Sequence, residues 1–125
     1  MKVVNPPKDE TQLAETGKWL YAGLAALGIK MNPEGFVLAW TGGASKVIVE
    51  TDSDNKITSA ALLAVGQKWT NSEQSATLLE MAGDRKRILD YCLDLANAFG
   101  ATHLYYDSEN DSEPGELTGV RCVTL

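Results

Sequence analysis

Few side chains in this sequence have the chemistry of nucleophilic catalysis or zinc binding. His103 is the single histidine, so any Ser–His–Asp or Cys–His arrangement would have to use it. It lies within an expected strand beside Tyr105, and no nucleophile elbow occurs in the chain, so we expect a structural or surface histidine. One histidine and two distant cysteines, Cys92 and Cys122, do not make a zinc site. We therefore predict no metal centre of this kind.

Two acidic stretches contain the oxygen ligands that calcium prefers. The first, "DSDN", holds Asp52, Asp54 and Asn55, and the second spans residues 107–116 and holds five acids. Neither has the turn glycine and terminal glutamate spacing of an EF-hand loop. We expect a hairpin turn at the first stretch and a solvated loop at the second.

Glu50 ends an expected central strand, where an amine-binding enzyme can keep a general base. An exposed glutamate at a strand end fits the same pattern without any catalytic role. The sequence therefore assigns no catalytic residue.

Composition and charge narrow the function classes. The chain has 125 residues, 44% of them hydrophobic, and we expect a single domain over residues 1–125. With 17 acids against 11 bases, the net charge of −6 argues against DNA or RNA binding and suits a basic protein partner. No apolar run is long enough to span a bilayer, and residues 1–4 are followed by Asn-Pro-Pro rather than a signal segment. We expect synthesis in the cytoplasm and no membrane partner.

The elements that must position these residues begin with a short strand and a helical segment. Residues 1–4 are apolar enough for a strand, which the two prolines then end. A helix follows from about residue 9 to 27, with Asp9 or Thr11 as its cap and Gly28 as its stop. We expect Gly17 to kink or break it, which would give two short helices.

A three-stranded antiparallel meander is predicted over residues 35–69. "GFVLAWT", residues 35–41, is rich in aromatic and aliphatic residues and predicts the first strand. Gly42 and Gly43 suit a primed hairpin turn to the second strand, residues 45–51. "DSDN" then turns the chain into a third strand at residues 56–69. The three tryptophans are expected to pack in or at the edge of the core; they are Trp19, Trp40 and Trp69.

The segment after the meander has two open interpretations. Residues 70–72 can cap one long helix that runs to Phe99, or residues 76–82 form a strand and a shorter helix starts at Gly83 and Asp84. Gly83 favours the second.

From residue 84 the helix is well defined. Cys92 falls on its apolar stripe and is expected to be a small buried hydrophobe, whereas Cys122 is either buried or reactive. Gly100 ends the helix, and strands follow at residues 101–107 and 117–125.

This order of elements resembles the N-acetyltransferase-like (GNAT) superfamily. "VVNPPKDETQLAE" is similar to the family's opening, "DNKITSAALLAVG" to the turn that enters a central strand, and "ILDYCLDLANAFGATHLYYDSEN" to its main helix, next strand and following asparagine, here Asn110. The resemblance implies an α+β fold: one mostly antiparallel meander sheet with two N-terminal helices and one long helix packed on it.

The resemblance also implies a place for acetyl-CoA, and there the sequence departs from the family. A glycine-rich loop before the main helix would cradle the pyrophosphate with backbone N–H groups. The corresponding "MAGDRKRIL" has one glycine, Gly83, followed by the negative Asp84; Arg85, Lys86 and Arg87 would hold phosphate only if the coenzyme binds. The alternative is a solvated basic helix start capped by Asp84.

In the GNAT family the asparagine is followed by a further helix, which often carries a tyrosine. The sequence departs from the family there too. Asn110 is followed by a short stretch rich in proline and glycine, and no tyrosine lies beyond Tyr106. Both departures predict a reduced scaffold without coenzyme binding.

Two functions follow. The first is a non-catalytic interaction or assembly protein with no cofactor and a protein partner, either a basic protein or a further copy in a homo-oligomer; phage-encoded virion components and accessory proteins are examples of such modules. The alternative is an acyl-CoA-dependent N-acyltransferase that uses acetyl-CoA and a primary amine.

Overall fold

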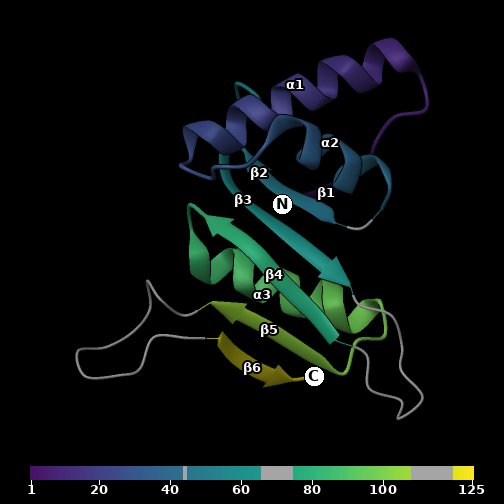
Figure 1. Cartoon of the computed structure of the whole chain (residues 1–125). Coiled ribbons are helices and arrows are strands. Elements are labelled where there is room, and N and C mark those ends of the chain that lie inside the picture. Colours follow the sequence, from purple (N-terminus) through teal and green to yellow (C-terminus); the bar gives the residue numbers. More distant parts are fainter. Residues whose placement is uncertain (44, 66–74, 108–119) are drawn as a thin grey trace.

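The computed structural model describes residues 1–43, 45–65, 75–107 and 120–125. Within these ranges the chain forms a six-stranded sheet whose strands follow one another in chain order, with helices on both faces (Figure 1). The elements are β1 (Lys2–Val4), α1 (Glu10–Ala26), α2 (Pro33–Thr41), β2 (Lys46–Thr51), β3 (Ile57–Val65), β4 (Ser75–Ala82), α3 (Arg85–Ala98), β5 (His103–Asp107) and β6 (Val120–Thr124). None of the helices in these ranges is both long and apolar enough to cross a lipid bilayer.

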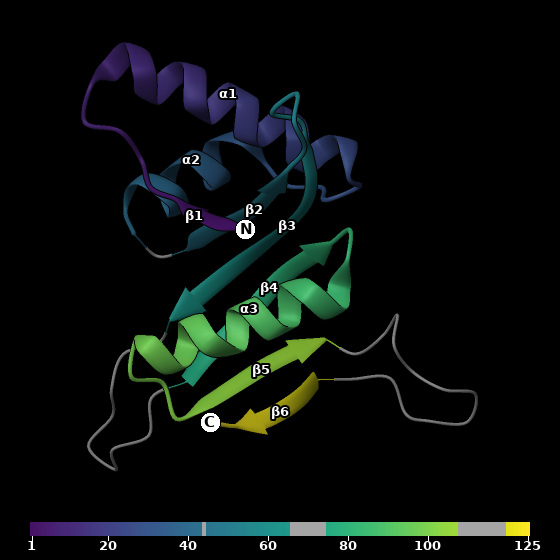
Figure 2. The same ribbon diagram turned by 180° about the vertical axis from the view of Figure 1, so that it is seen from behind.

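The sheet is antiparallel except at one pair. β4 and β5 run parallel because α3 connects them as a crossover, as two parallel strands require. Figure 2 shows α3 on the face of the sheet opposite to α1 and α2. The α+β architecture with a mostly antiparallel sheet is therefore confirmed.

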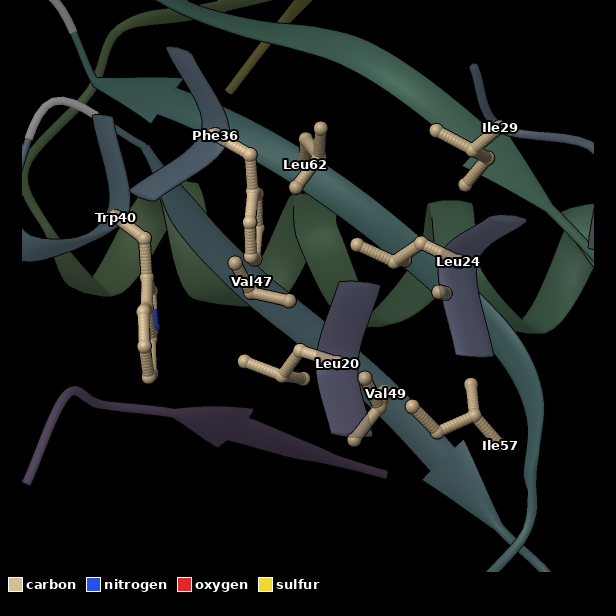
Figure 3. Close-up of a cluster of buried hydrophobic side chains, with 10 residues drawn as sticks. Leu20, Leu24, Ile29, Phe36, Trp40, Val47, Val49, Ile57 and Leu62 are labelled. Carbon is tan, nitrogen blue, oxygen red and sulfur yellow. The ribbon is translucent and has the colours of Figure 1, made fainter. Parts of the chain in front are cut away.

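Alternating side chains on β2 and β3 fill two separate cores. Val47 and Val49 point toward α1 and α2, where they meet Leu20 and Trp40 (Figure 3). Ile48, between them, belongs to the core under α3. This period of two is what a central strand buried on both faces requires.

The second helix is the largest difference from the sequence prediction. Residues 35–41 are not a strand; they belong to α2, so the predicted first strand of the meander is wrong. Asn32 caps the helix, because its Oδ1 accepts the N–H groups of Glu34 at 2.9 Å and Gly35 at 3.2 Å, and Pro33 takes the first helical position. The second N-terminal helix is thus α2 and not a fragment of α1.

The predicted hairpin turn at Gly42 and Gly43 is wrong for the same reason. The N–H of Gly42 donates to the carbonyl of Leu38 at 2.9 Å and ends α2. Gly43 follows with a φ of 78°. The two glycines therefore stop a helix, the other common use of glycine at positive φ.

Most of the remaining predicted elements are confirmed. The turn after β2 is held by Asp52, whose Oδ1 accepts the N–H groups of Asp54 and Lys56 at 2.9 and 3.0 Å. β4 confirms the strand alternative for residues 76–82, and α3 starts directly after Asp84. Three predicted features lie outside the described residues: Trp69, the end of the third strand and the acidic loop from residue 108.

α1 is one continuous helix, so the predicted break at Gly17 is wrong. Asp9 caps it by accepting the N–H of Gln12 at 3.0 Å, as one of the two expected caps. A Cβ added at Gly17 would lie 3.5 Å from Trp40 Cζ3, an ordinary contact, whereas a Cβ at Gly23 would lie 2.5 Å from Ile57 Cδ1. An added Cβ at position 23 would also lie 3.1 Å from Ile57 Cβ, so packing favours glycine there, whereas position 17 has room for a methyl group.

These two glycines give a matched prediction. Gly17→Ala is expected to raise the free energy of unfolding by up to about 1 kcal/mol, because alanine has the better helix propensity and the methyl group has room. Gly23→Ala is expected to lower it, since overpacking against Ile57 costs about 1–3 kcal/mol and exceeds the propensity gain. Urea unfolding of the two variants measures both signs, and a shared sign would contradict the packing described for α1.

Candidate functional site

The candidate coenzyme site is the turn from β4 into α3, and it is short. β4 ends at Ala82 and α3 begins at Arg85, so only Gly83 and Asp84 connect them. Gly83 has a φ of 92°, and a Cβ there would lie 2.6 Å from both Ser59 Cα and the carbonyl oxygen of Thr58. The turn therefore lies directly on β3.

Asp84 caps α3, as predicted for a solvated basic helix start. Its side-chain Oδ1 accepts the N–H of Arg87 at 3.2 Å, and its own N–H donates to Ser59 Oγ at 2.9 Å. Ser59 is buried on β3 and was not singled out from the sequence. Its only sequence signal is a hydroxyl next to Thr58 at the start of a strand that is apolar from Ala60 onward. Two of the N–H groups that a phosphate would use are thus already bonded within the chain.

Two of the three bases after Asp84 are directed at the protein. Arg85 is partly buried, and its Nη1 donates to the carbonyl of Met81 at 3.2 Å. Arg87 Nη2 lies 2.5 Å from Glu50 Oε2. Lys86 is exposed. The tentative phosphate ligands therefore sit together with Gly83 at the start of α3, and two of the three are engaged with other groups of the chain.

Glu50, the candidate general base, is joined to this turn by its contact with Arg87. Its side chain is 17% exposed, and across the sheet it stands opposite Ser59. Ser59 and Glu50 therefore hold the first residues of α3 from two neighbouring strands. The ion pair gives Glu50 a contact with the first turn of α3.

A capping prediction follows from Asp84. Asp84→Ala is expected to lower the free energy of unfolding by about 1 kcal/mol, because the N–H of Arg87 loses its acceptor. Asp84→Asn keeps an acceptor of equal capping strength and is expected to lose only a few tenths of a kcal/mol. Urea unfolding of both variants measures the difference, and equal losses would show that charge rather than capping holds this turn.

β4 pairs with β5 through its first residues. Among the described residues, the register joins Ser75–Leu78 to His103–Tyr106. On the other side, the β3–β4 register shifts at Leu62 and Leu63 and leaves Leu79 as an extra residue with 51% of its surface exposed. Both views show the end of β4 next to Gly83 diverging from the described part of β5 (Figures 1 and 2).

The other chemical candidates have structural roles. His103 Nδ1 lies 2.9 Å from Thr102 Oγ1 and its ring stacks on Tyr105. Cys92 is fully buried, and burial raises the pKa of its thiol to about 12, which makes it unreactive at neutral pH. Within the described ranges no three His, Cys, Asp or Glu side chains are grouped as a metal site would need.

An exposed apolar face on α2 was missed by the sequence reasoning, because its residues were assigned to a strand. Val37 is 43% exposed and Leu38 is 72% exposed. The capping pair Asn32 and Pro33 was the signal that could have identified the helix.

The comparisons with known proteins agree with this architecture. No family model and no curated protein matches the sequence. Among solved structures, a ribosomal-protein-alanine N-acetyltransferase from Brucella melitensis biovar Abortus 2308 is similar with a TM-score of 0.63 and 7% identity, covering 94% of each chain. The chain has the GNAT fold.

Two further structures support the GNAT fold at equally low identity. A probable acetyltransferase matches with a TM-score of 0.60 and 11% identity, over 91% of this chain and 83% of its own. An aminoglycoside acetyltransferase from an uncultured soil metagenomic sample matches with a TM-score of 0.59 and 8% identity, over 84% and 76%. Because these identities are low, the GNAT fold is what they show, and this chain's chemistry must be argued from its own residues.

Proposed function

We propose that this chain is a non-catalytic protein-binding module built on a GNAT fold. The observation that carries the proposal is the two-residue connection of Gly83 and Asp84. A pyrophosphate needs several free N–H groups on a loop or helix start and no negative charge among them. Here a carboxylate accepts one N–H of the first helical turn and Ser59 accepts another. The residues of this turn do not fit the coenzyme.

The bases near this turn do not compensate for Asp84. The guanidinium of Arg87 is engaged with Glu50, and that of Arg85 reaches back to Met81. Lys86 is exposed, and the Arg87 side chain is 63% exposed although it is paired with Glu50; exposed cations of this kind are weak anchors for two phosphates. The proposed phosphate role of these residues belongs to the alternative function below.

The alternative is an acyl-CoA-dependent N-acyltransferase that acts on a primary amine. One observation favours it: the end of β4 diverges from the described part of β5 next to Gly83, where the resemblance places the coenzyme (Figures 1 and 2). In that case Gly83 and residues 85–87 would hold the phosphates. A phage origin and a place in a virion stay predictions.

Thermal unfolding with acetyl-CoA separates the two functions. A ligand at 100 times its dissociation constant stabilises a protein by about 2.7 kcal/mol, which raises Tm by several degrees. We expect no rise with about 1 mM acetyl-CoA beyond that produced by inorganic pyrophosphate at equal ionic strength. The Asp84→Asn variant, which lacks the negative charge, is measured beside the wild type. A saturable rise specific to acetyl-CoA in the wild type would refute the proposed function.

A further inference from the structure

α2 is largely apolar but is covered on only one side. Of its nine residues, Glu34 alone is charged. A helix of this composition is normally buried on all sides. Here Phe36 and Trp40 point into the core and stack on each other, with ring centroids 6.0 Å apart (Figure 3). Val37 and Leu38, on the other side, are 43% and 72% exposed.

A groove between α1 and α2 adjoins these exposed side chains. Its volume is about 500 Å³, and most of its wall is apolar. α1 contributes residues at helical spacing, among them Leu13, Gly17 and Tyr21, and α2 contributes Phe36 and Val37. A second hollow of about 500 Å³, lined by Pro33, Glu34, Val37 and Leu38, continues the same surface around α2. One face of the molecule thus combines apolar projections with an apolar groove.

Gly17 keeps this groove deep. The nearest atom to an added Cβ is Trp40 Cζ3 at 3.5 Å, so no clash inside the chain requires glycine there. A glycine within a helix nevertheless costs about 1 kcal/mol relative to alanine. Because position 17 lines the groove, its missing side chain leaves room for an apolar side chain from outside.

The charge distribution of the chain indicates which kind of partner binds at this groove. Residues 1–43 hold four bases and four acids, so this part is neutral (4 − 4 = 0), and the remaining seven bases and thirteen acids account for the whole net charge of −6 (7 − 13 = −6). A basic partner would be drawn to the acidic remainder of the chain rather than to this face. The segment that carries α1 and α2 adds no net charge of its own to a contact with a second copy. The groove also carries both signs, with Glu10 and Lys18 on α1, as a self-complementary surface needs.

We propose that a second copy of this chain covers α2. In this two-fold dimer, Val37 and Leu38 of each copy enter the groove between α1 and α2 of the other. The inference rests on the proposed function, because it names the protein partner of the binding module. An isologous contact of this kind uses the same patch on both copies, which fits a face that offers both the projections and the groove.

Sedimentation velocity of the full chain tests the proposal. The chain has a mass of 13.5 kDa, and we expect the weight-average mass to rise toward twice that value as the concentration is raised from about 1 μM to about 500 μM. Leu38→Glu is expected to weaken the dimer at least about tenfold. It should leave the far-ultraviolet circular dichroism unchanged, because Leu38 is 72% exposed.

A matched pair of variants locates the contact. Val37 and Phe99 are both 43% exposed, but Phe99 directly follows α3, which lies on the opposite face of the sheet. Val37→Glu is expected to dissociate the dimer and Phe99→Glu to leave it intact. A wild type that stays monomeric over the whole range would overturn the proposal, and so would a dimer that neither Leu38→Glu nor Val37→Glu weakens. These measurements contain no acetyl-CoA, so their outcome is independent of the melting experiment that tests the proposed function.

Discussion

Gly83→Ala is expected to destabilise the chain by about 3 kcal/mol. Two costs add: a left-handed backbone conformation costs a residue with a Cβ about 1–2 kcal/mol, and forced overpacking costs about 1–3 kcal/mol. Both apply at Gly83, where φ is 92° and an added Cβ would lie 2.6 Å from Ser59 Cα and from the carbonyl oxygen of Thr58. The backbone of β3 cannot move away without breaking its ladder with β2 and β4. Urea unfolding measures the loss.

Gly28→Ala is the control for Gly83→Ala. Gly28 has nearly the same φ, 89°, but an added Cβ there would meet nothing within 4 Å. Gly28→Ala is therefore expected to lower the free energy of unfolding only by the backbone cost of about 1–2 kcal/mol. If the two variants lose equal stability, the close approach of the turn to Ser59 is wrong. The argument that leaves no room for a phosphate loop would then fail with it.

Trp40→Ala is expected to lower the free energy of unfolding by about 3–5 kcal/mol, the usual cost of truncating a large buried aromatic side chain. Trp40 is 2% exposed and stacks on Phe36 with an interplanar angle of 6°. Its indole Nε1 donates to the carbonyl of Val4 at 2.9 Å, which ties β1 to α2. The substitution therefore removes core volume and an attachment of the edge strand together. Chemical denaturation measures the loss.

Trp40→Phe separates these two contributions. Phenylalanine keeps most of the stacking on Phe36 but has no donor for Val4, so we expect a loss of about 1–2 kcal/mol. If Trp40→Ala and Trp40→Phe are equally harmful, the hydrogen bond and not the packing holds α2 in place. A loss below about 1 kcal/mol for Trp40→Ala would contradict the burial of α2 on the sheet.

The turn at Asp52, β4 and α3 could be predicted from the sequence because the residues that define them are close together in the chain. Gly83 marks the end of β4, Asp84 caps α3, and the apolar stripe that contains Cys92 gives the helix its buried face. The turn at Asp52 is formed by side chains that bond their own neighbouring backbone. None of these features depends on a distant residue.

α2 was mispredicted because its composition and its environment disagree. Residues 35–41 are aromatic and aliphatic with no polar face, a pattern that short buried strands and buried helices share. Asn32 and Pro33, which precede the predicted strand, are together a helix cap and a first helical residue. If a second copy covers Val37 and Leu38, the apolar composition of this helix is explained by contacts that one copy does not contain.

The arrangement of the candidate site was not predictable because it depends on residues distant in the chain. Glu50 and Arg87 come from β2 and α3, and Ser59 from β3. Local pattern correctly identified Gly83 and Asp84 as the turn, but not that β3 lies against it. The cap by Asp84 was expected, but the bond from the Asp84 N–H to Ser59 was a finding of the structure.

The most direct test of the account is an NMR titration of the backbone N–H groups of residues 84–87 with acetyl-CoA. The account predicts that these resonances move no more with acetyl-CoA than with a salt control of equal ionic strength, because Ser59 and the Asp84 carboxylate already occupy two of the donors. Saturable shifts centred on Asp84 and Arg87 would contradict it and would establish a working coenzyme site at this turn.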